Sequence, residues 1–500
     1  MIATYASAAL ICAVSLLVGR AVLSLAGGRE WSWLEPAVGL GAVLTVTGLL
    51  ARAPGHGTSA TLGLVLLAAA AAAIVFAELP FCPGGRDKTA TRRGCWREGL
   101  PVALVLVLVL SIPFAISGRW GLLGVGFNND LGLHLAWAEW LRSGFGPDAE
   151  PGYPLGPHGL AVAVAAVPGI GLGQAFVGQI VAIGVMTGLT ALGALRSLTP
   201  GRRTLGAAMV ALPYLAASYY AQAAFKETAA ALLVLAFAIW LTRFEGVPDG
   251  WRRRFLFALP ALALTAGIFF SYSFAGVAWP VAILALWSLT LPEVRAVLQP
   301  RSLLRFLLRP LTLLTLVVLA GLGLLVTIGP FGFAGAFNKV AASNTYGPVS
   351  ALEALGIWPT SNYRLDAEGS VRLPVLAGTI SILALLAGIA WWTRRRELTI
   401  PVALAGAALL YLASLPTSGD YSQAKALIIM APLAMLVIVR PLLEEFPRFG
   451  RRGRGLAGPS PLLSAEPLSR VPLIQEPLLT SSNYGFAQGL FRVVSWLPTE

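Results

Sequence analysis

The stretch ATLGLVLLAAAAAAIVFAEL, residues 60–79, carries no charge before Glu78. It is long enough to cross a bilayer, since a helical span takes about 20 apolar residues. Comparable runs recur along the chain, which is 57% hydrophobic, 12% charged and has a mean hydropathy of +0.76. A soluble core could not cover so much apolar surface. Because lipid offers no hydrogen bonds to the backbone, the sequence predicts an all-α, polytopic transmembrane helical bundle.

About thirteen spans are expected. They are residues 3–26, 34–51, 60–79, 100–117, 174–195, 204–222, 226–243, 254–271, 274–291, 310–329, 373–392, 399–415 and 424–440. Residues 157–171 are rich in Ala and Gly but too short for a span. They are expected to form a re-entrant or interfacial helix instead.

The formal net charge of +13 comes from basic loops that alternate with loops poor in Arg and Lys. The basic segments are 86–97, 196–203, 243–254, 295–309, 394–396 and 440–454. This is the positive-inside pattern, which predicts a multi-pass plasma-membrane protein with its N-terminus outside and its C-terminus in the cytoplasm. Polyanion binding is the alternative explanation, but topology accounts for the charge, and no nucleic-acid partner is expected.

The chain divides into three parts. Residues 1–99 read as an N-terminal three-helix membrane extension. Residues 100–443 read as a transmembrane core with two large outer loops, 118–173 and 330–372. Residues 444–500 read as a cytoplasmic, linker-like tail that could carry a short interfacial helix. Four tryptophans are expected to be membrane-interface anchors: Trp137, Trp140, Trp391 and Trp392.

The first outer loop holds the residues of greatest chemical interest. Asp130 follows Asn129 and begins an amphipathic surface helix over residues 131–143, where it acts as the N-cap. His134 lies one helical turn later, on the same face. A carboxylate beside an imidazole at a membrane surface suits proton transfer, so these two residues are the predicted catalytic pair. The alternatives are a helix cap for Asp130 and an interfacial histidine bonded to it for His134.

A stiff turn follows the surface helix. Its sequence, PGYPLGPH, is expected to position Tyr153 and His158 for ligand contact, although a structural turn is an equal alternative. The second outer loop contributes Tyr363, whose ring suits the apolar face of a sugar. These three side chains are assigned to substrate binding, together with Asn129.

Two lysines are predicted at helix starts on the outer face. Lys226 is followed by Glu227, and Lys425 follows Asp420 in a short outer turn. A cation at a helix N-terminus opposes the helix dipole, and a bound phosphate would resolve this conflict. All four residues are assigned to substrate binding. The alternatives are snorkelling lysines and a glutamate that simply neutralises Lys226.

No cofactor or metal is expected. Asp130 and His134 alone are too few ligands for a divalent ion, and His158 would have to come close to complete a site. A divalent metal therefore remains a minor alternative.

Several of these segments resemble the GT-C superfamily of membrane glycosyltransferases, which use polyprenyl-phosphate-linked sugars. The resemblance covers roughly residues 100–440. It is carried by Asn129-Asp130 with His134, by Tyr153-Pro154-Leu155-Gly156-Pro157-His158, and by Tyr421-Ser422-Gln423-Ala424-Lys425-Ala426-Leu427. They are similar to segments of an uncharacterised actinobacterial-type group of that superfamily. The resemblance implies a GT-C-like bundle with interfacial helices in its outer loops.

By the same resemblance, Asp130 takes the place of the acidic residue of the first outer loop, the general base. The implied activity is transfer of a sugar from a polyprenyl-phosphate donor to an extracytoplasmic acceptor such as a cell-envelope glycan, lipid or protein. Two alternatives stay open. One is a transporter or lipid flippase, which would need polar groups at mid-membrane depth. The other is a non-catalytic scaffold on a glycosyltransferase frame, because no second acidic residue follows Asp130.

Overall fold

The computed structural model describes most of the chain. The described residues are 1–28, 30–77, 88–123, 130–149, 152–244, 248–292, 294, 349–355, 372–416 and 418–453. Every regular element among them is an α-helix or a 3-10 helix, which confirms the all-α prediction. Seven described segments are long and apolar enough to cross a membrane: α1 (Ile2–Leu25), α3 (Gly57–Ala77), α4 (Lys88–Leu110) continued by α5 (Ile112–Ser117), α8 (Leu172–Ala191) continued by η1 (Leu192–Ala194), α12 (Trp251–Tyr272), α18 (Arg372–Arg394) and α20 (Asp420–Gly453).

The other helices are shorter. They are α2 (Glu35–Leu50), α6 (Asp130–Ser143), α7 (Gly156–Ala165), α9 (Pro200–Ala211), α10 (Tyr214–Ala221), α11 (Phe225–Leu241), α13 (Phe274–Ser288), η2 (Ala351–Leu355) and α19 (Thr399–Ser414). The expected count of about thirteen spans stays a prediction. Its span at 310–329, most of the second outer loop and the tail beyond residue 453 lie outside the described residues.

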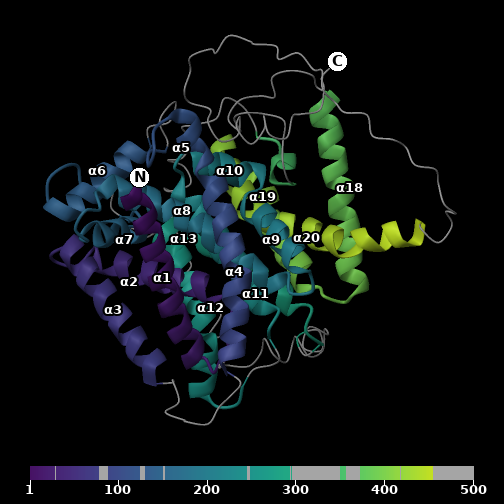
Figure 1. The fold of residues 1–500 in the computed structure, drawn as a ribbon, viewed down its shortest axis with the longest axis horizontal. Helices are drawn as coiled ribbons and strands as arrows, with labels where there is room; N and C mark the ends of the chain where they lie inside the picture. The colour runs from purple at the N-terminus through teal and green to yellow at the C-terminus, as the bar shows by residue number, and fades with distance from the viewer. Residues whose placement is uncertain are drawn as a thin grey trace.

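The helices form one bundle around α8 and α11 (Figure 1). The apolar window of α8 is 94% buried, whereas the windows of α3 and α18 are only 17% buried and present apolar side chains outward, as lipid-facing helices do. In Figure 1, α1 to α3 lie on one side, α4 runs near the middle, and α18 lies on the other side. Since α1 packs against α8, and α2 against α7 and α12, the first three helices are part of the same bundle as the rest.

The two ends of the bundle differ in character. At one end, Arg52 in the turn after α2 donates to the carbonyl oxygen of Tyr153, and His56 packs on Trp140 of α6. We call this the histidine end. The opposite end, here the arginine end, carries the turns after α1, η1, α11 and α18.

The chain breaks where one continuous span was expected over residues 204–222. The structure has α9 and α10 instead, separated by Leu212 and Pro213, so that prediction was wrong. Leu212 leaves the helical region, with φ −129° and ψ 55°. The reason is that proline has no N–H for the helix ladder and its ring disfavours a helical residue before it.

The expected non-spanning segment is present as the ten-residue helix α7. Each residue from Gly156 to Val164 is buried, and the helix packs against α2, α3 and α8. A helix lying on the membrane surface would expose one face. Helix α7 therefore does not lie exposed on the membrane surface, and the re-entrant alternative stays a prediction.

Two of the four expected interface tryptophans are buried inside the protein. Trp137 is 4% exposed and Trp392 is 1% exposed. The Trp137 ring packs on Tyr153 with centroids 4.5 Å apart, and the Trp392 indole N–H donates to the Val437 carbonyl oxygen. The anchor prediction was wrong for these two, because helix position alone does not reveal which face of the helix meets protein.

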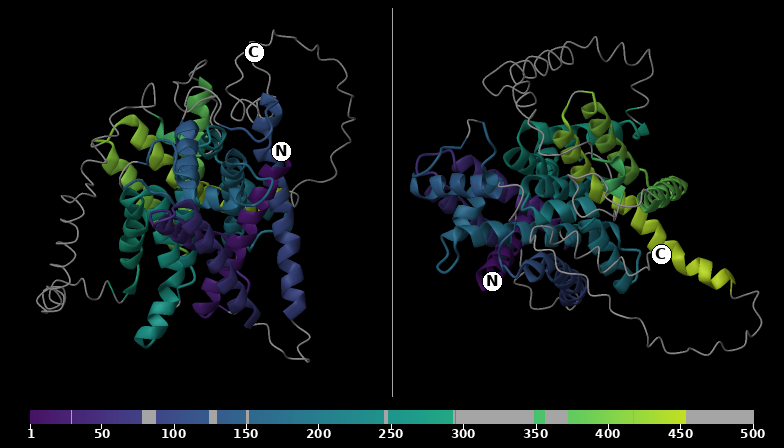
Figure 2. Two further views of the ribbon diagram at one scale, coloured as in Figure 1. Left: turned by 90° about the vertical axis from the view of Figure 1, so that its left-hand side faces the viewer. Right: turned by 90° about the horizontal axis from the view of Figure 1, so that it is seen from above.

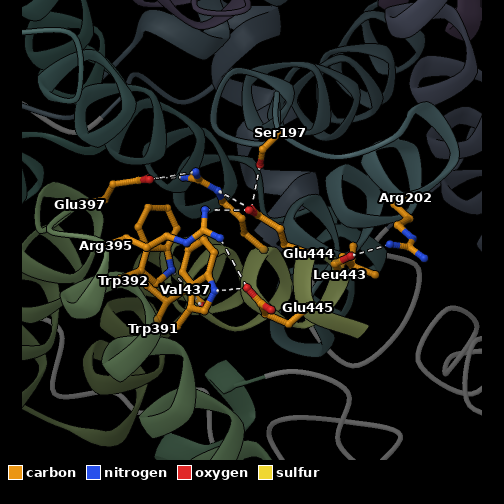
Figure 3. Close-up of polar contacts among 11 residues, drawn as sticks. Ser197, Arg202, Trp391, Trp392, Arg395, Glu397, Val437, Leu443, Glu444 and Glu445 are labelled. Atoms are coloured by element: carbon orange, nitrogen blue, oxygen red, sulfur yellow. Dashed lines mark hydrogen bonds and ion pairs between the residues drawn. The ribbon is translucent and has the colours of Figure 1, made fainter. Parts of the chain in front are cut away.

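A network of charges fastens the α18–α19 turn to α20 at the arginine end (Figure 3). Arg395 contacts Glu444 at 2.7 Å, and Arg440 contacts Glu397 at 2.7 Å. The Trp391 indole N–H donates to Glu445. Beyond this network, the yellow end of α20 leaves the bundle, as the right panel of Figure 2 shows. The network therefore holds α20 at the point where it emerges.

Helices α1 and α2 cross so closely that glycine is required at two positions. A Cβ added to Gly39 would lie 1.7 Å from the Ser15 carbonyl oxygen, and one added to Gly19 would lie 1.8 Å from the Glu35 carbonyl oxygen. Both obstacles are backbone atoms, which cannot rotate away. Small residues at a helix crossing allow such close backbone approach in membranes.

Gly39→Ala is accordingly expected to destabilise the protein. The added methyl group must push α1 and α2 apart, and overpacking of this kind costs about 1–3 kcal/mol. Thermal unfolding in detergent checks the effect against Gly173→Ala in α8, where a Cβ would have open space. Equal melting temperatures for the two variants would contradict the close crossing.

Candidate functional site

Six side chains that sequence reasoning singled out meet at the histidine end. This histidine-end cluster consists of His134, Tyr153, His158, Lys226, Glu227 and Lys425. Its members come from α6, the turn before α7, α7 itself, the first turn of α11, and α20. The turn before α7 is set by Gly152, which has a φ of +81°, a conformation that favours glycine. Elements far apart in the sequence therefore build one polar site.

The two histidines of the cluster are bonded to each other. His158 Nε2 and His134 Nδ1 are 3.2 Å apart, and the two residues are 0% and 7% exposed. Phe225 packs edge-on against both rings, and Phe176 packs against His158. Because one ring nitrogen must donate and the other accept, each histidine fixes the tautomer and orientation of its partner.

Burial keeps this pair neutral. Together with the nearby Lys226 ammonium, it lowers the pKa of His158 to about 3. Burial also lowers the pKa of His134 far below its usual range, with Lys226 and His158 contributing. The same desolvation and the same lysine disfavour a bound cation. Among the described residues, no group of three or more His, Cys, Asp or Glu could hold a metal ion.

Stability is expected to fall as the pH is lowered from 6.5 toward 3. Unfolded histidine takes up a proton near pH 6.5, whereas folded His158 resists protonation until about pH 3. The unfolded state therefore binds more protons, and at pH 5 the loss from His158 is about 2 kcal/mol. Melting temperatures at pH 7.5 and 5.0 would measure it. The drop should shrink in His158→Gln and persist in His56→Gln; an unchanged drop in His158→Gln would refute this assignment.

The two lysines approach from different helices. Lys226 of α11 donates to the hydroxyl of Tyr153, and its Nζ lies 4.7 Å from the centre of that ring. Lys425 of α20 lies over the ring of Tyr421, 4.1 Å from its centre. Both ammonium groups act on His134 electrostatically. The two cations of the cluster thus lie near the starts of α11 and α20, and each lies over a phenol ring, that of Tyr153 or that of Tyr421.

Glu227 pairs with Lys425 across the two helices. Its Oε1 lies 3.0 Å from Lys425 Nζ, and the side chains are 3% and 16% exposed. Sequence reasoning had offered neutralisation of the adjacent Lys226 as this glutamate's structural role. Consecutive residues of a helix point in different directions, so the glutamate can pair with a lysine of a neighbouring helix. The Lys226 charge also acts on Glu227 and, like that of Lys425, favours its ionised form.

The remaining predicted site residues are placed less completely. Asp130 is the first residue of α6, one turn before His134, and only its backbone is described. Asp420 is the first residue of α20, and Lys425 follows on the same helix less than two turns later. Asn129 and Tyr363 lie outside the described residues.

Sequence reasoning missed the aromatic side chains that enclose the cluster. Phe176 and Phe225 seal the histidine pair, and their rings are 5.3 Å apart. Trp137 packs against His134 and Tyr153, and Tyr421 lies under Lys425. Phe225 and Tyr421 offered one usable signal, since each is close in sequence to a predicted lysine. Phe176 sits in an apolar run and offered none.

Comparison with known proteins returned no match. No protein family model matches the chain, no curated protein matches it, and no solved structure matches it. The function therefore has to be argued from the cluster itself.

Proposed function

We propose that the protein is an integral membrane glycosyltransferase that moves a sugar from a polyprenyl-phosphate donor to an extracytoplasmic acceptor. The observation that carries the proposal is the convergence of Lys226 and Lys425, both near helix N-termini, at one end of a membrane bundle. Ammonium groups, phenol hydroxyls and helix N-termini together suit a phosphate. A lipid-linked phosphate reaches such a place from the bilayer without crossing water.

The neighbouring residues suit the rest of the reaction. Asp130 begins the helix that carries His134, and it is the proposed general base. It accepts the proton of an acceptor hydroxyl as that oxygen attacks the anomeric carbon of the donor. The bond from that carbon to the phosphate oxygen breaks, and polyprenyl phosphate leaves with the bonding electrons. Lys226 and Lys425 stabilise the departing phosphate charge.

The other proposed roles follow from position. His134 orients Asp130, and His158 holds His134 through their hydrogen bond. Tyr153 holds Lys226, while Glu227 fixes Lys425. Asn129, Tyr363 and Asp420 are proposed substrate contacts. The alternation of basic loops supports a plasma-membrane location with the histidine end outside.

A non-catalytic scaffold is the second candidate, and one observation favours it. His158 is 0% exposed and is sealed by aromatic rings, as a purely structural residue would be. In that case the histidine-end cluster would hold helices together and bind no donor.

Incubating the purified protein with a panel of polyprenyl-phosphate sugars separates the two candidates. The enzyme is expected to release or transfer sugar from at least one donor and to be stabilised thermally by that donor. If no donor of the panel is turned over and none stabilises the protein, the glycosyltransferase proposal is wrong and the scaffold is favoured.

A further inference from the structure

A second charged cluster lies at the arginine end, away from the proposed donor site. This Arg243 cluster consists of Arg20, Ser32, Glu35, Arg196 and Arg243. Its members come from the last turns of α1, the turn before α2, the first residue of α2, the turn after η1, and the turn after α11. Since Ser32 and Glu35 belong to one segment, four separate segments of the chain bring their polar groups to one place.

A buried carboxylate lies at the base of the cluster. Glu35 is 0% exposed, and its Oε1 accepts a hydrogen bond from the Ser32 backbone N–H at 3.1 Å. Arg20 Nη1 lies 3.5 Å from the same oxygen and donates to the Glu30 carbonyl oxygen. One arginine is thus matched to the one buried carboxylate.

The other two arginines form no ion pair with a carboxylate in the described part of the chain. Arg243 Nη1 donates to Ser32 Oγ at 2.6 Å, which fixes the guanidinium beside a neutral hydroxyl. Burial and the nearby Arg196 guanidinium lower the pKa of Arg243 to about 10, against the pull of Glu35. Arg196 is exposed and makes no ion pair with the described residues. A Cβ built on Gly193, three residues before Arg196, would lie 3.8 Å from Arg243 Nη2, and both arginines are exposed. Two like charges therefore lie near each other at the surface.

The charge count leaves room for an anion. Among the residues that the structure describes here, three arginines stand against Glu35 and the exposed Glu30, an excess of one positive charge. The position is the end of membrane-crossing helices, which is where lipid headgroups lie.

We infer that the Arg243 cluster binds the headgroup of one anionic phospholipid. The phosphate sits between Arg196 and Arg243 and relieves their mutual repulsion, while the acyl chains lie along the outside of the bundle. Basic pockets between transmembrane helices recognise anionic headgroups in this way. The inference does not depend on the proposed glycosyltransferase activity.

Native mass spectrometry of the detergent-purified protein, titrated with phosphatidylglycerol or phosphatidylcholine, tests the inference. The wild type is expected to retain one phosphatidylglycerol in preference to phosphatidylcholine. Arg196→Gln/Arg243→Gln should bind it about 30-fold more weakly, since each lost charge near the surface weakens binding about fivefold. The matched control is Arg252→Gln/Arg253→Gln, which removes two exposed arginines at the same end of the bundle and should bind like the wild type.

Three results would overturn the inference. They are wild-type affinity in Arg196→Gln/Arg243→Gln, equal weakening in both double variants, and protection from unfolding by inorganic phosphate equal to that by phosphatidylglycerol. The last would mean a site for free phosphate. If the double variant does not fold, Arg196→Gln alone serves, because that side chain is exposed; it should weaken binding about fivefold.

Discussion

Lys425→Met is expected to lower the free energy of unfolding by roughly 3–5 kcal/mol, the cost of leaving one partner of a buried ion pair without its counter-ion. The pair joins α20 to α11, and Glu227 is only 3% exposed. Without the lysine, the glutamate must either stay charged in an apolar setting or take up a proton. Methionine keeps most of the lysine's volume, so the change removes charge rather than packing.

The double variant Glu227→Gln/Lys425→Met supplies the control. It removes both charges together, and buried pairs replaced by neutral residues of similar size often lose little stability. Thermal unfolding in detergent should therefore rank the wild type and double variant above Lys425→Met. If the single and double variants have the same melting temperature, the loss of stability in Lys425→Met does not come from the broken ion pair. A folded double variant that no longer binds donor would also separate the lysine's role in binding from its role in folding.

Asp130→Asn is expected to reduce sugar transfer by about 100- to 10,000-fold, the range for loss of a positioned general base. The amide cannot accept the acceptor's proton at neutral pH. Stability should change little, because Asn and Asp serve almost equally well at a helix start. Transfer rates with the best donor of the panel, together with melting temperatures, measure both effects.

Glu139→Gln is the matched control for Asp130→Asn. It makes the same carboxylate-to-amide change on the same helix, α6, at a side chain that is 40% exposed and pairs only with Arg142 in the described part of the chain. It should retain wild-type transfer. Full activity in Asp130→Asn would mean that Asp130 only begins the helix and is not the general base. Equal losses of activity in both variants would mean that transfer depends on helix α6 in general and not on Asp130.

The sequence predicted those site residues whose polar side chains stand out within a short stretch of the chain. His134, Tyr153 and His158 stood out as polar residues between apolar spans, and they do come together. Lys226 and Lys425 stood out as cations at helix starts. No local pattern revealed the bonding partners: His134 bonds to His158, and Glu227 forms an ion pair with Lys425 of another helix. The two histidines are 24 positions apart in the sequence, and Glu227 and Lys425 are 198 positions apart. Helix packing brings such residues together, and their spacing in the sequence does not reveal it.

For the fold, too, local sequence determined some properties and helix packing decided the others. By itself, the sequence determined an all-helical membrane bundle, because a span's length and apolarity are local properties and lipid leaves its backbone no other partner. The tertiary structure alone decided which faces are buried. It put Trp137 and Trp392 inside, drew α7 into the bundle and brought α1 against α2 at Gly39. An apolar side chain is equally stable against lipid or protein, so hydrophobicity cannot distinguish the two faces, and only close packing between helices can.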